Sequence, residues 1–466
     1  MEISILSGVT ASEQADINVS LPVNLECIPT TTGFSKAYLR SAPGVVPFGN
    51  TGLTDHGGIV WNGTHYRALG TNLCSVAQDG TILGIGTIGG AVLPEVARTK
   101  FDYSFTHLGI NRGVNLFLYD GTTITRISDP DLGDCLDFVW MRGQFVSTDG
   151  TSIVVNQLSD PFAVDPLKYT GAEDDPDGIV GLLRLGTQLV ALGTNTIQFF
   201  SYTGGSGFPF DANLNATISI GCAGRYAKTL YDSGFAWVGQ RRNQQLGVWY
   251  SEGGDPVKLS TREIDTRLAA EPNPGGIVVE ERTDQNERRL YVHLTDCTLV
   301  YLKTASEGLQ SRFWYVAYGN RTLDARYRPR SPILAYGKWV VGDADAGGLG
   351  IIDDTTATVF GEGIGWLFDT PFGYNEAKGG ILHRLELTGV PGRGGPSSVF
   401  MSWTLDGESW SEERAAGPIP NGQPSPRVSW RTHKRFGNYI GLRFRGDSEA
   451  LAAWGRLDAE VEALAV

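Results

Sequence analysis

Short hairpins recur along most of this chain, and this recurrence constrains the fold more than any other feature of the sequence. Gly58 to Gly70 has the pattern of two strands around Asn62-Gly63, and Asn72 to Gly86 has the same pattern around Asp79-Gly80. Asn-Gly and Asp-Gly supply the positive φ angles that a two-residue β-turn requires. Because sustained helical periodicity is scarce, the sequence predicts an all-β fold.

The hairpins group into a unit of roughly 40 residues with about four strands, which is the period of β-propeller blades. Further units occur at 114–127, 138–155, 179–202, 227–259, 277–318 and, in part, 333–353. The sequence therefore predicts a propeller-like body of six or seven blades at residues 57–360. A short helix is expected near 260–270, where Thr261 or the serine before it precedes Ile264 and Leu268, and prolines follow.

The two ends of the chain differ from this body. Four prolines interrupt the first fifty residues, which predicts an extended N-terminal arm at 1–56 that wraps onto the body. Beyond about Phe360, alternating apolar stretches are separated by loops rich in Pro and Gly, at 390–398 and 417–426. This pattern predicts a C-terminal β-sandwich or jelly-roll domain at 361–466. Its last residues fit either a final strand or a short helix.

Composition limits the class of protein. The chain has 466 residues, a hydrophobic fraction of 41% and a net charge of −13, which suit an acidic globular protein. Five scattered cysteines predict reduced core thiols rather than disulfides, and we expect no signal peptide and no membrane span. An acidic chain is a poor general DNA binder, although an acidic wall would let a duplex slide past without sticking. Solubility is the simpler explanation of the acidity.

No motif of the chain has a catalytic signature, and the sequence predicts no enzyme, no metal site and no cofactor. Gly84 to Gly89 matches G-x-G-x-x-G, but a hairpin precedes it, so a Gly-rich outer strand is expected. Acidic clusters at 129–134, 174–177 and 343–345 resemble partial Ca²⁺ loops and are expected to be turns. The six histidines lack the spacing of a zinc site. Paired carboxylates of a glycosidase stay an open alternative, because they need only spatial proximity.

Two basic stretches stand out against the acidic background. The first is a predicted loop that contains Tyr327 and Pro329, and the second alternates basic and aromatic residues along predicted strands. The candidate interface or DNA-channel residues are Arg321, Arg326, Arg328 and Arg330 in the first stretch, and Arg427, Arg431, Lys434, Arg435, Arg443 and Arg445 in the second. Three interpretations are open for them: contact with DNA phosphate, contact with an acidic neighbouring subunit, and a solvated strand face.

Three segments resemble one protein family in their order and spacing. They are Tyr38 to Gly44, Asp177 to Gly204, and Val399 to Arg445, in which a Thr404-Leu-Asp-Gly turn precedes a stretch that ends in Gly441-Leu-Arg-Phe-Arg. Together they resemble the packaged-DNA stabilisation proteins of short-tailed double-stranded-DNA phages, which are also called tail hub or nozzle proteins.

The resemblance implies a structural virion protein of the phage tail, assembled in the host cytoplasm, with no catalytic residue. It implies a hexameric ring below the portal and its adaptor, which closes the channel behind packaged DNA together with a tail needle and opens on ejection. Tailspikes or other receptor-binding proteins, and translocating DNA without sequence specificity, are the other implied partners. We expect the N-terminal arm and the Pro/Gly loops at subunit interfaces.

The alternative function is a carbohydrate-binding or polysaccharide-degrading propeller associated with a phage tail. Ser402 to Trp410 is similar to a sialidase Asp-box but is one residue short between Asp406 and Trp410. It fits better a structural hairpin of discoidin-like jelly rolls, in which Asp406 and Gly407 make the turn and Trp410 packs.

Overall fold

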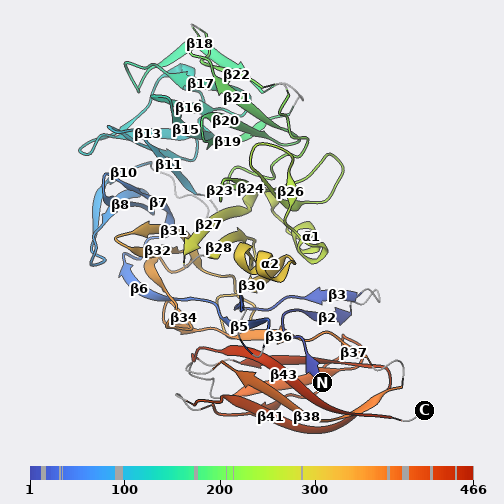
Figure 1. Cartoon of the computed structure of the whole chain (residues 1–466). Helices are drawn as coiled ribbons and strands as arrows, with labels where there is room; N and C mark the ends of the chain where they lie inside the picture. Colours follow the sequence, from blue (N-terminus) through green and yellow to red (C-terminus); the bar gives the residue numbers. More distant parts are fainter. Residues whose placement is uncertain are drawn as a thin grey trace.

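The computed structural model describes residues 1–11, 17–30, 33, 35–89, 98–172, 177–205, 207–213, 215–284, 287–374, 378–390, 398–419, 423–446 and 449–464. Within these residues the chain is mostly β-strand, with two short α-helices. Figure 1 shows a larger body of strands and, below it, a smaller red body that contains both termini.

Six antiparallel four-stranded sheets follow one another along the described chain, each built from four consecutive strands, and we call them blades 1 to 6. Blade 1 consists of β7 (Asp55–Trp61), β8 (Thr64–Leu69), β9 (Asn72–Val76) and β10 (Ile82–Thr87). Blade 2 consists of β11 (Thr99–Tyr103), β12 (Leu108–Arg112), β13 (Asn115–Tyr119) and β14 (Ile124–Arg126). Blade 3 consists of β15 (Asp137–Met141), β16 (Gln144–Thr148), β17 (Ser152–Asn156) and β18 (Val164–Gly171). Blade 4 consists of β19 (Ile179–Leu185), β20 (Gln188–Gly193), β21 (Ile197–Tyr202) and β22 (Phe210–Ala212). Blade 5 consists of β23 (Lys228–Tyr231), β24 (Gly234–Gly239), β25 (Gly247–Ser251) and β26 (Val257–Lys258). Blade 6 consists of β27 (Val278–Asp284), β28 (Glu287–His293), β29 (Thr298–Leu302) and β30 (Phe313–Ala317).

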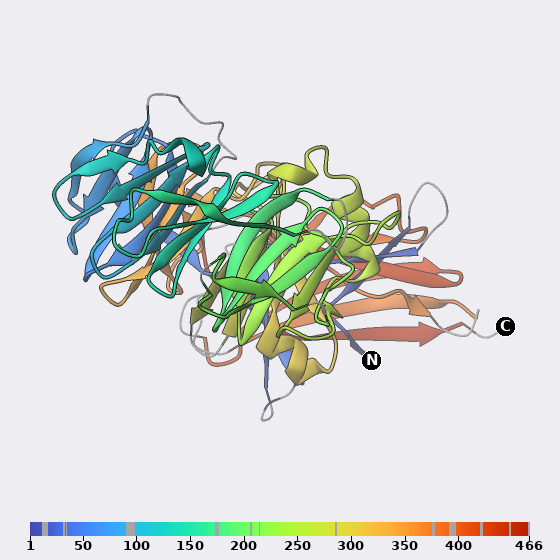
Figure 2. The same cartoon turned by 90° about the horizontal axis from the view of Figure 1, so that it is seen from above.

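A seventh blade combines strands from the two ends of this series. β31 (Pro329–Ala335), β32 (Lys338–Asp343) and β33 (Gly348–Asp353) pair in order, and β6 (Gly44–Asn50) adds the fourth strand beside β33, followed by the short β34 (Thr358–Val359) and β35 (Glu362–Gly363). The first strand of each blade contacts the first strand of the next, and β31 contacts β7. The described strands thus form a closed seven-bladed propeller, which confirms the predicted fold. Figure 2 shows it beside the sandwich.

Tight turns with left-handed residues join the first two strands of several blades. Asn62 and Gly63 have φ angles of 48° and 78°, and Tyr336 and Gly337 have 52° and 74°. Two consecutive positive φ angles are the requirement of a type I′ turn, which matches the twist of the flanking strands. The segment with the G-x-G-x-x-G pattern forms most of β10, the outer strand of blade 1, as expected.

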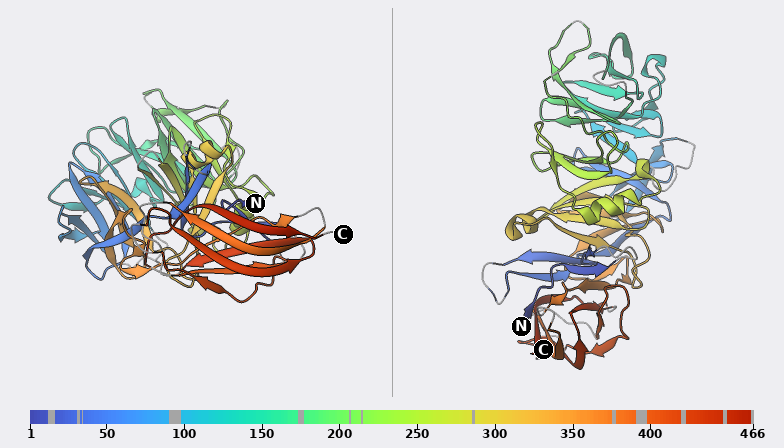
Figure 3. Two further views of the ribbon diagram at one scale, coloured as in Figure 1. Left: turned by 60° about the horizontal axis from the view of Figure 1, so that its bottom comes forward. Right: turned by 90° about the vertical axis from the view of Figure 1, so that its right-hand side faces the viewer.

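The red body is a β-sandwich of two sheets, as predicted (Figure 3). One sheet has the order β4 (Leu25–Pro29), β5 (Ala37–Ser41), β43 (Ala453–Ala463), β38 (Gly380–Gly389) and β41 (Arg427–Phe436), with β1 (Glu2–Ile3) beside β43. The other has the order β36 (Trp366–Asp369), β42 (Tyr439–Gly446), β39 (Val399–Thr404) and β40 (Arg414–Ala416), with β37 (Gly373–Tyr374) beside β42. Of the two structures that the last residues allow, the chain adopts the strand.

The N-terminal segment, residues 1–50, supplies strands to both bodies. β1, β4 and β5 belong to the sandwich, β6 belongs to blade 7, and β2 (Gly8–Ala11) pairs with β3 (Ile17–Ser20). Between β3 and β4, the backbone of Val23 forms bridges to Val316 of β30 and to Leu367 of β36. The Val23 N–H donates to the Leu367 carbonyl at 2.8 Å. A continuous line of backbone contacts therefore joins blade 6 to the sandwich.

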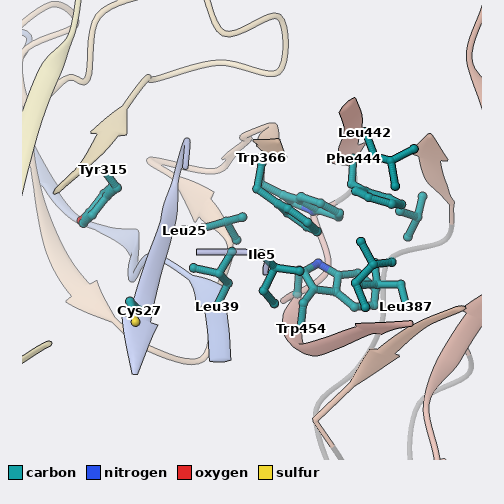
Figure 4. Packing of buried hydrophobic residues seen from close by; sticks show 14 of the residues in the cluster. Ile5, Leu25, Cys27, Leu39, Tyr315, Trp366, Leu387, Leu442, Phe444 and Trp454 are labelled. Carbon is teal, nitrogen blue, oxygen red and sulfur yellow. The ribbon is translucent and has the colours of Figure 1, made fainter. Parts of the chain in front are cut away.

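One hydrophobic cluster spans the N-terminal segment, the sandwich and blade 6. Leu25 and Leu39 are fully buried beside Trp366 and Trp454, whose ring centroids lie 5.5 Å apart (Figure 4). Tyr315 of blade 6 belongs to the same cluster. Burial of one such large side chain contributes about 1.5–3 kcal/mol. The cluster therefore holds the sandwich against the propeller.

The two helices lie beside blades 5 and 6. α1 (Arg262–Ala269) falls in the segment with the predicted helix and buries Ile264 and Leu268. α2 (Lys303–Leu309) was not predicted, because its sequence contains a glycine and its N-cap makes no side-chain hydrogen bond. Instead the Glu287 carboxylate accepts hydrogen bonds from the N–H groups of Thr304 (2.9 Å) and Ala305 (3.1 Å).

The five cysteines are buried and free, as predicted. Burial, with a smaller contribution from Asp137, raises the pKa of Cys135 to about 12. No helix of the described residues has the length and apolarity needed to cross a membrane.

Candidate functional site

The ten predicted basic residues lie in four places rather than two. Arg321, Arg326 and Arg328 lie in the connection between blades 6 and 7, as predicted for a loop, whereas Arg330 lies in β31, the innermost strand of blade 7. The remaining residues divide between the two sheets of the sandwich: Arg427, Arg431, Lys434 and Arg435 on β41, and Arg443 and Arg445 on β42. The second basic stretch of the sequence therefore does not form one surface.

Carboxylates neutralise the loop between blades 6 and 7. Arg321 forms an ion pair with Glu449 at 2.9 Å, and Arg326 forms one with Asp345. Arg328 pairs with Asp343 and also with Glu362 at 3.1 Å, and its guanidinium lies 5.4 Å from the centroid of the Phe360 ring. Two of the acidic residues that resembled part of a Ca²⁺ loop are thus partners of arginines.

Arg330 is buried inside the propeller, with only 6% of its surface exposed. Its guanidinium donates to His293 and, at 3.3 Å, to the Thr298 hydroxyl. Burial, reinforced by repulsion from Arg98, lowers the pKa of Arg330 to about 9. Arg330 therefore presents little of its side chain to the surface of the folded chain.

The arginines of β42 bind carboxylates through two nitrogens each. Arg443 donates to Asp369 from Nε at 2.7 Å and from Nη2 at 2.9 Å, and its guanidinium lies 3.9 Å from the Trp410 ring centroid. Arg445 binds Glu413 in the same way, at 2.5 and 2.6 Å. Trp410 follows a turn in which the Asp406 carboxylate accepts two backbone N–H groups. Both the turn and the packed tryptophan agree with the structural hairpin that the sequence favours.

β41 is the edge strand of its sheet and presents a basic face. Arg427, Arg431 and Arg435 are exposed on this face, which we call the β41 face. Arg427 lies 3.5 Å from Glu386, whereas no carboxylate of the described residues lies within ion-pair distance of Arg431 or Arg435. Lys434 is only half-exposed and lies 5.7 Å from the centroid of the Trp403 ring.

The propeller axis holds a second charged site, which the sequence did not reveal. A cavity of about 410 Å³ is lined by the inner strands of blades 1, 2, 4, 5, 6 and 7. Its wall contains Arg98, Lys100, Arg225, Lys228, Glu280 and Glu281. Each residue comes from the start of a blade, and a charge near the start of successive repeats is the signal that could have indicated the site.

Polar contacts cross the axis of the propeller at this cavity. Asp137 of blade 3 forms ion pairs of 2.8 Å with both Lys100 of blade 2 and Lys228 of blade 5. The Tyr226 hydroxyl, from the entrance to blade 5, donates to the Arg98 carbonyl at the entrance to blade 2, at 2.6 Å. The Asp137–Lys228 and Tyr226–Arg98 contacts join blades that are not neighbours, and the Asp137–Lys100 pair joins two adjacent blades.

The other acidic clusters of the sequence form turns and caps. Asp129 accepts the N–H of Asp131 at 2.9 Å and that of Val164 at 3.0 Å. Asp177 accepts the N–H of Thr196 at 3.0 Å, while its neighbours at 174 and 175 lie outside the described residues. In the part of the chain that the structure describes, no three His, Cys, Asp or Glu side chains are placed to hold a metal ion.

Family models match the two bodies of the chain in order. The model described as Bacteriophage P22 Gp10, beta-propeller, matches residues 1–357, and the model described as Bacteriophage P22 Gp10, beta-sandwich, matches residues 365–462. The chain belongs to the bacteriophage P22 Gp10 family. The resemblance to phage tail hub proteins that the sequence suggests is confirmed by this membership.

One similar protein is a tail hub protein of a known phage. The tail hub protein gp10 of Salmonella phage P22 is 26% identical to this chain over an alignment of length 460 that covers 93% of each protein. The family models and this relative together support a structural role in a phage tail hub.

Solved structures share less with this Gp10-family chain. The designed Ika8 protein has 10% identity, covers 66% of this chain and 99% of its own, and gives a TM-score of 0.40. The N-terminal domain of Nup159 has 10% identity, with 72% and 99% covered and a TM-score of 0.41. The Neurospora crassa Pan2 WD40 domain has 6% identity, with 66% and 95% covered and a TM-score of 0.41. TM-scores of 0.40 and 0.41 are too low to support a common function, so the assignment of this chain to its family rests on the family models.

Proposed function

We propose that this chain is the tail hub protein of a short-tailed double-stranded-DNA bacteriophage. The observation that carries the proposal is the match of Gp10 family models to the propeller and then to the sandwich, together with a relative that is aligned over 93% of both chains. In this role the chain is a structural part of the virion tail, assembled in the host cytoplasm. It forms a hexameric ring below the portal–adaptor complex, retains packaged DNA and provides the channel for ejection.

The DNA channel of this ring runs between subunits and not along the axis of a propeller. A cavity of about 410 Å³ has the size of a small-molecule pocket, far below that of a duplex. The ion pair of Asp137 with Lys228 also joins the inner strands of two blades that are not neighbours. A ring of copies is therefore the arrangement that leaves an opening wide enough for DNA.

The charges of the chain suit a channel wall along which DNA slides without tight binding of its phosphates. Most of the predicted basic residues are neutralised by carboxylates, and retention of phosphate requires several uncompensated cations. We propose that the β41 face contacts an acidic neighbouring protein, either another hub subunit or a tailspike, because Arg431 and Arg435 are exposed there. The tail needle is the remaining proposed partner.

We also propose three parts for the chain: an arm at 1–56, a propeller at 57–360 and a sandwich at 361–466. The family models, which divide between residues 357 and 365, support the second limit. Strands β4 and β5 of the arm are occupied by the sandwich, which leaves the β2–β3 hairpin as its proposed subunit contact. Of the Pro/Gly loops proposed at interfaces, residues 391–397 and 420–422 lie outside the described residues.

Electron microscopy of the purified chain, alone and mixed with a portal–adaptor complex, tests this function. We expect a ring with a central opening wide enough for a duplex, either in solution or on the complex. The variant Arg431→Glu/Arg435→Glu should weaken assembly, whereas Arg126→Glu, an exposed arginine on the outer strand of blade 2, should not. A chain that stays monomeric with the complex would contradict the proposal. Hydrolysis of host polysaccharide by that monomer would favour the glycan-active alternative.

A further inference from the structure

Two histidines meet on the exposed face of the sandwich sheet that contains β38, β41 and β43. His383 of β38 and His433 of β41 are 50 positions apart in the chain, yet their Nδ1 atoms lie 3.0 Å apart. Nε2 of His383 also lies 2.8 Å from the Glu462 carboxylate of β43. The three side chains thus form a row across three neighbouring strands, which no local pattern of the sequence could reveal.

Two β-bulges place these histidines on the same face. His383 is the additional residue of β38 where its register against β43 shifts, between Leu382 and Arg384. Thr432 and His433 of β41 together lie opposite His383, where the register between β38 and β41 shifts. His433 has a φ of 51°, a left-handed conformation that is uncommon for a residue other than glycine. Bulges change the direction of side chains and are frequent beside functional sites.

The contact with Glu462 determines which histidine nitrogens carry protons. A carboxylate accepts hydrogen bonds, so Nε2 of His383 donates to Glu462, and Nδ1 of a neutral His383 then carries a lone pair. This lone pair accepts the Nδ1–H of His433. A carboxylate on the outer nitrogen is the usual companion of a metal-bound histidine, because it fixes the tautomer and raises the basicity of the nitrogen that binds the metal.

The separation of the two Nδ1 atoms suits a shared metal ion. Two nitrogens on one tetrahedral Zn²⁺ lie about 3.3 Å apart when each Zn–N bond is about 2.0–2.1 Å. The Nδ1 atoms of His383 and His433, at 3.0 Å, need to separate only slightly. A shift of the His433 proton from Nδ1 to Nε2, which leaves the charge of the ring unchanged, gives both Nδ1 lone pairs to the metal. Imidazole favours Zn²⁺, Cu²⁺ and Ni²⁺, whereas Mg²⁺ and Ca²⁺ prefer oxygen ligands.

The charges beside the histidines are of both signs. Exposed charged side chains flank the pair on the two neighbouring strands: Arg431 and Arg435 of β41, and Glu460 and Glu462 of β43. Arg384, next to His383, forms an ion pair with Glu386 at 2.6 Å. The carboxylates of β43 therefore offset the repulsion that the arginines of β41 exert on a cation.

We propose that Nδ1 of His383 and Nδ1 of His433 bind one divalent transition-metal ion of the Zn²⁺ class, with Glu462 as a positioning residue and water as the remaining ligands. Two protein ligands are fewer than the four of a structural zinc site, so the ion is bound more weakly and stays exchangeable. The ion would join the edge strand β41 to β38 and stabilise the folded chain by mass action. This proposal does not depend on the role of the chain in a tail hub.

Calorimetric titration of Zn²⁺ into the full chain, without an affinity tag and after treatment with EDTA, tests the site. We expect one saturable site per chain and no comparable binding of Mg²⁺. His383→Gln and His433→Asn should each abolish it, and asparagine tolerates the left-handed conformation at position 433. His107→Gln, which changes a half-exposed histidine of the propeller, is the matched control and should bind as the unmodified chain does.

The role of Glu462 has its own variants. Glu462→Ala should weaken Zn²⁺ binding by about tenfold, and Glu462→Gln, whose amide oxygen still accepts from Nε2 of His383, should recover most of this loss. Equal Zn²⁺ affinities of Glu462→Ala and the unmodified chain would overturn the positioning role.

Electron paramagnetic resonance of the Cu²⁺-loaded chain counts the ligands directly. We expect two imidazole nitrogens on the ion in the unmodified chain and one in His433→Asn. An absence of saturable Zn²⁺ binding by the unmodified chain would overturn the proposal. Undiminished Zn²⁺ binding by both histidine variants would also overturn it, because the ion would then be held elsewhere.

Discussion

Glu26 shows at the scale of one residue how the N-terminal segment is bound to the propeller. It is fully buried in β4, and its two oxygens accept from Nε and Nη2 of Arg289 in blade 6, at 2.6 and 2.8 Å. Burial alone would raise the pKa of Glu26, but the charge of Arg289 and its hydrogen bonds outweigh burial and lower the pKa to about 2. The pair joins residues that are far apart in the sequence.

Replacement of Glu26 by glutamine should destabilise the chain strongly. The change leaves the buried Arg289 with Asp284 as its remaining carboxylate partner, and loss of one partner of a buried pair costs about 3–5 kcal/mol. Urea unfolding, followed by tryptophan fluorescence, measures the shift in midpoint. Glu460→Gln, on the exposed face of β43, is the matched control and should change stability by less than about 0.5 kcal/mol. Equal midpoints for the two variants would contradict the assigned role.

The same pair makes a prediction about pH. The pKa of Glu26 is lowered from its ordinary value of 4.5 to about 2 in the folded chain. Its contribution to stability is therefore fully present above pH 4.5 and is lost as the pH falls towards about 2. We expect the difference in stability between the unmodified chain and Glu26→Gln to shrink over this interval. A difference that does not change with pH would contradict the assignment.

At the scale of elements, strand β6 closes the propeller. Its residues pair with β33, so the first and last parts of the propeller share one blade. Val45 is fully buried against Val341 and Val359, whereas its neighbour Val46 points outward with 40% of its surface exposed. Val45 therefore contributes buried apolar contacts to the closure of blade 7, whereas Val46 does not.

Val45→Asp should open blade 7, whereas Val46→Asp should not. A carboxylate at position 45 would lie among the apolar side chains of its cluster, and a buried charge in such surroundings costs several kcal/mol. At position 46 the carboxylate stays in water and costs less than about 1 kcal/mol through strand propensity. Differential scanning fluorimetry of both variants measures the effect. Similar losses of Tm in the two variants would argue against a closing role for β6.

The elements that the sequence predicts are those specified by neighbouring residues. Asn62-Gly63 and Tyr336-Gly337 determine their turns locally, so the hairpins and the four-strand period could be found. α2 could not, because its N-terminus is bound by Glu287 of another strand. The axial site was also missed, since Lys100, Asp137 and Lys228 come from three different blades. Nor could clustering of basic residues show that Arg443 is neutralised by Asp369, which lies 74 positions earlier in the chain.

At the scale of the whole molecule, the propeller and the sandwich share one core. The cluster that contains Leu39, Trp454 and Tyr315 draws on the N-terminal segment, the sandwich and blade 6. Val23 adds backbone hydrogen bonds on both sides of the junction. Two domains with so much shared buried surface are expected to lose their structure together.

Calorimetry of the full chain should therefore show one unfolding transition. Leu39→Asp, which places a charge in the shared core, should divide it into two transitions, because each body retains its own remaining contacts. Leu405→Asp, at a side chain that is 41% exposed, is the control and should leave a single transition. Two separate transitions in the unmodified chain would show that the bodies are energetically independent.

The closure of blade 7 by β6 also determines when a newly made chain can reach its final shape. β6 leaves the ribosome early, but its partner β33 follows about 300 residues later, which at about 5–20 residues per second is a delay of about 15–60 s. β5 waits longer still, because it pairs with β43 near the end of the chain. During translation β5 and β6 must remain unpaired, so the propeller and its junction with the sandwich are completed only after β33 and β43 have been made.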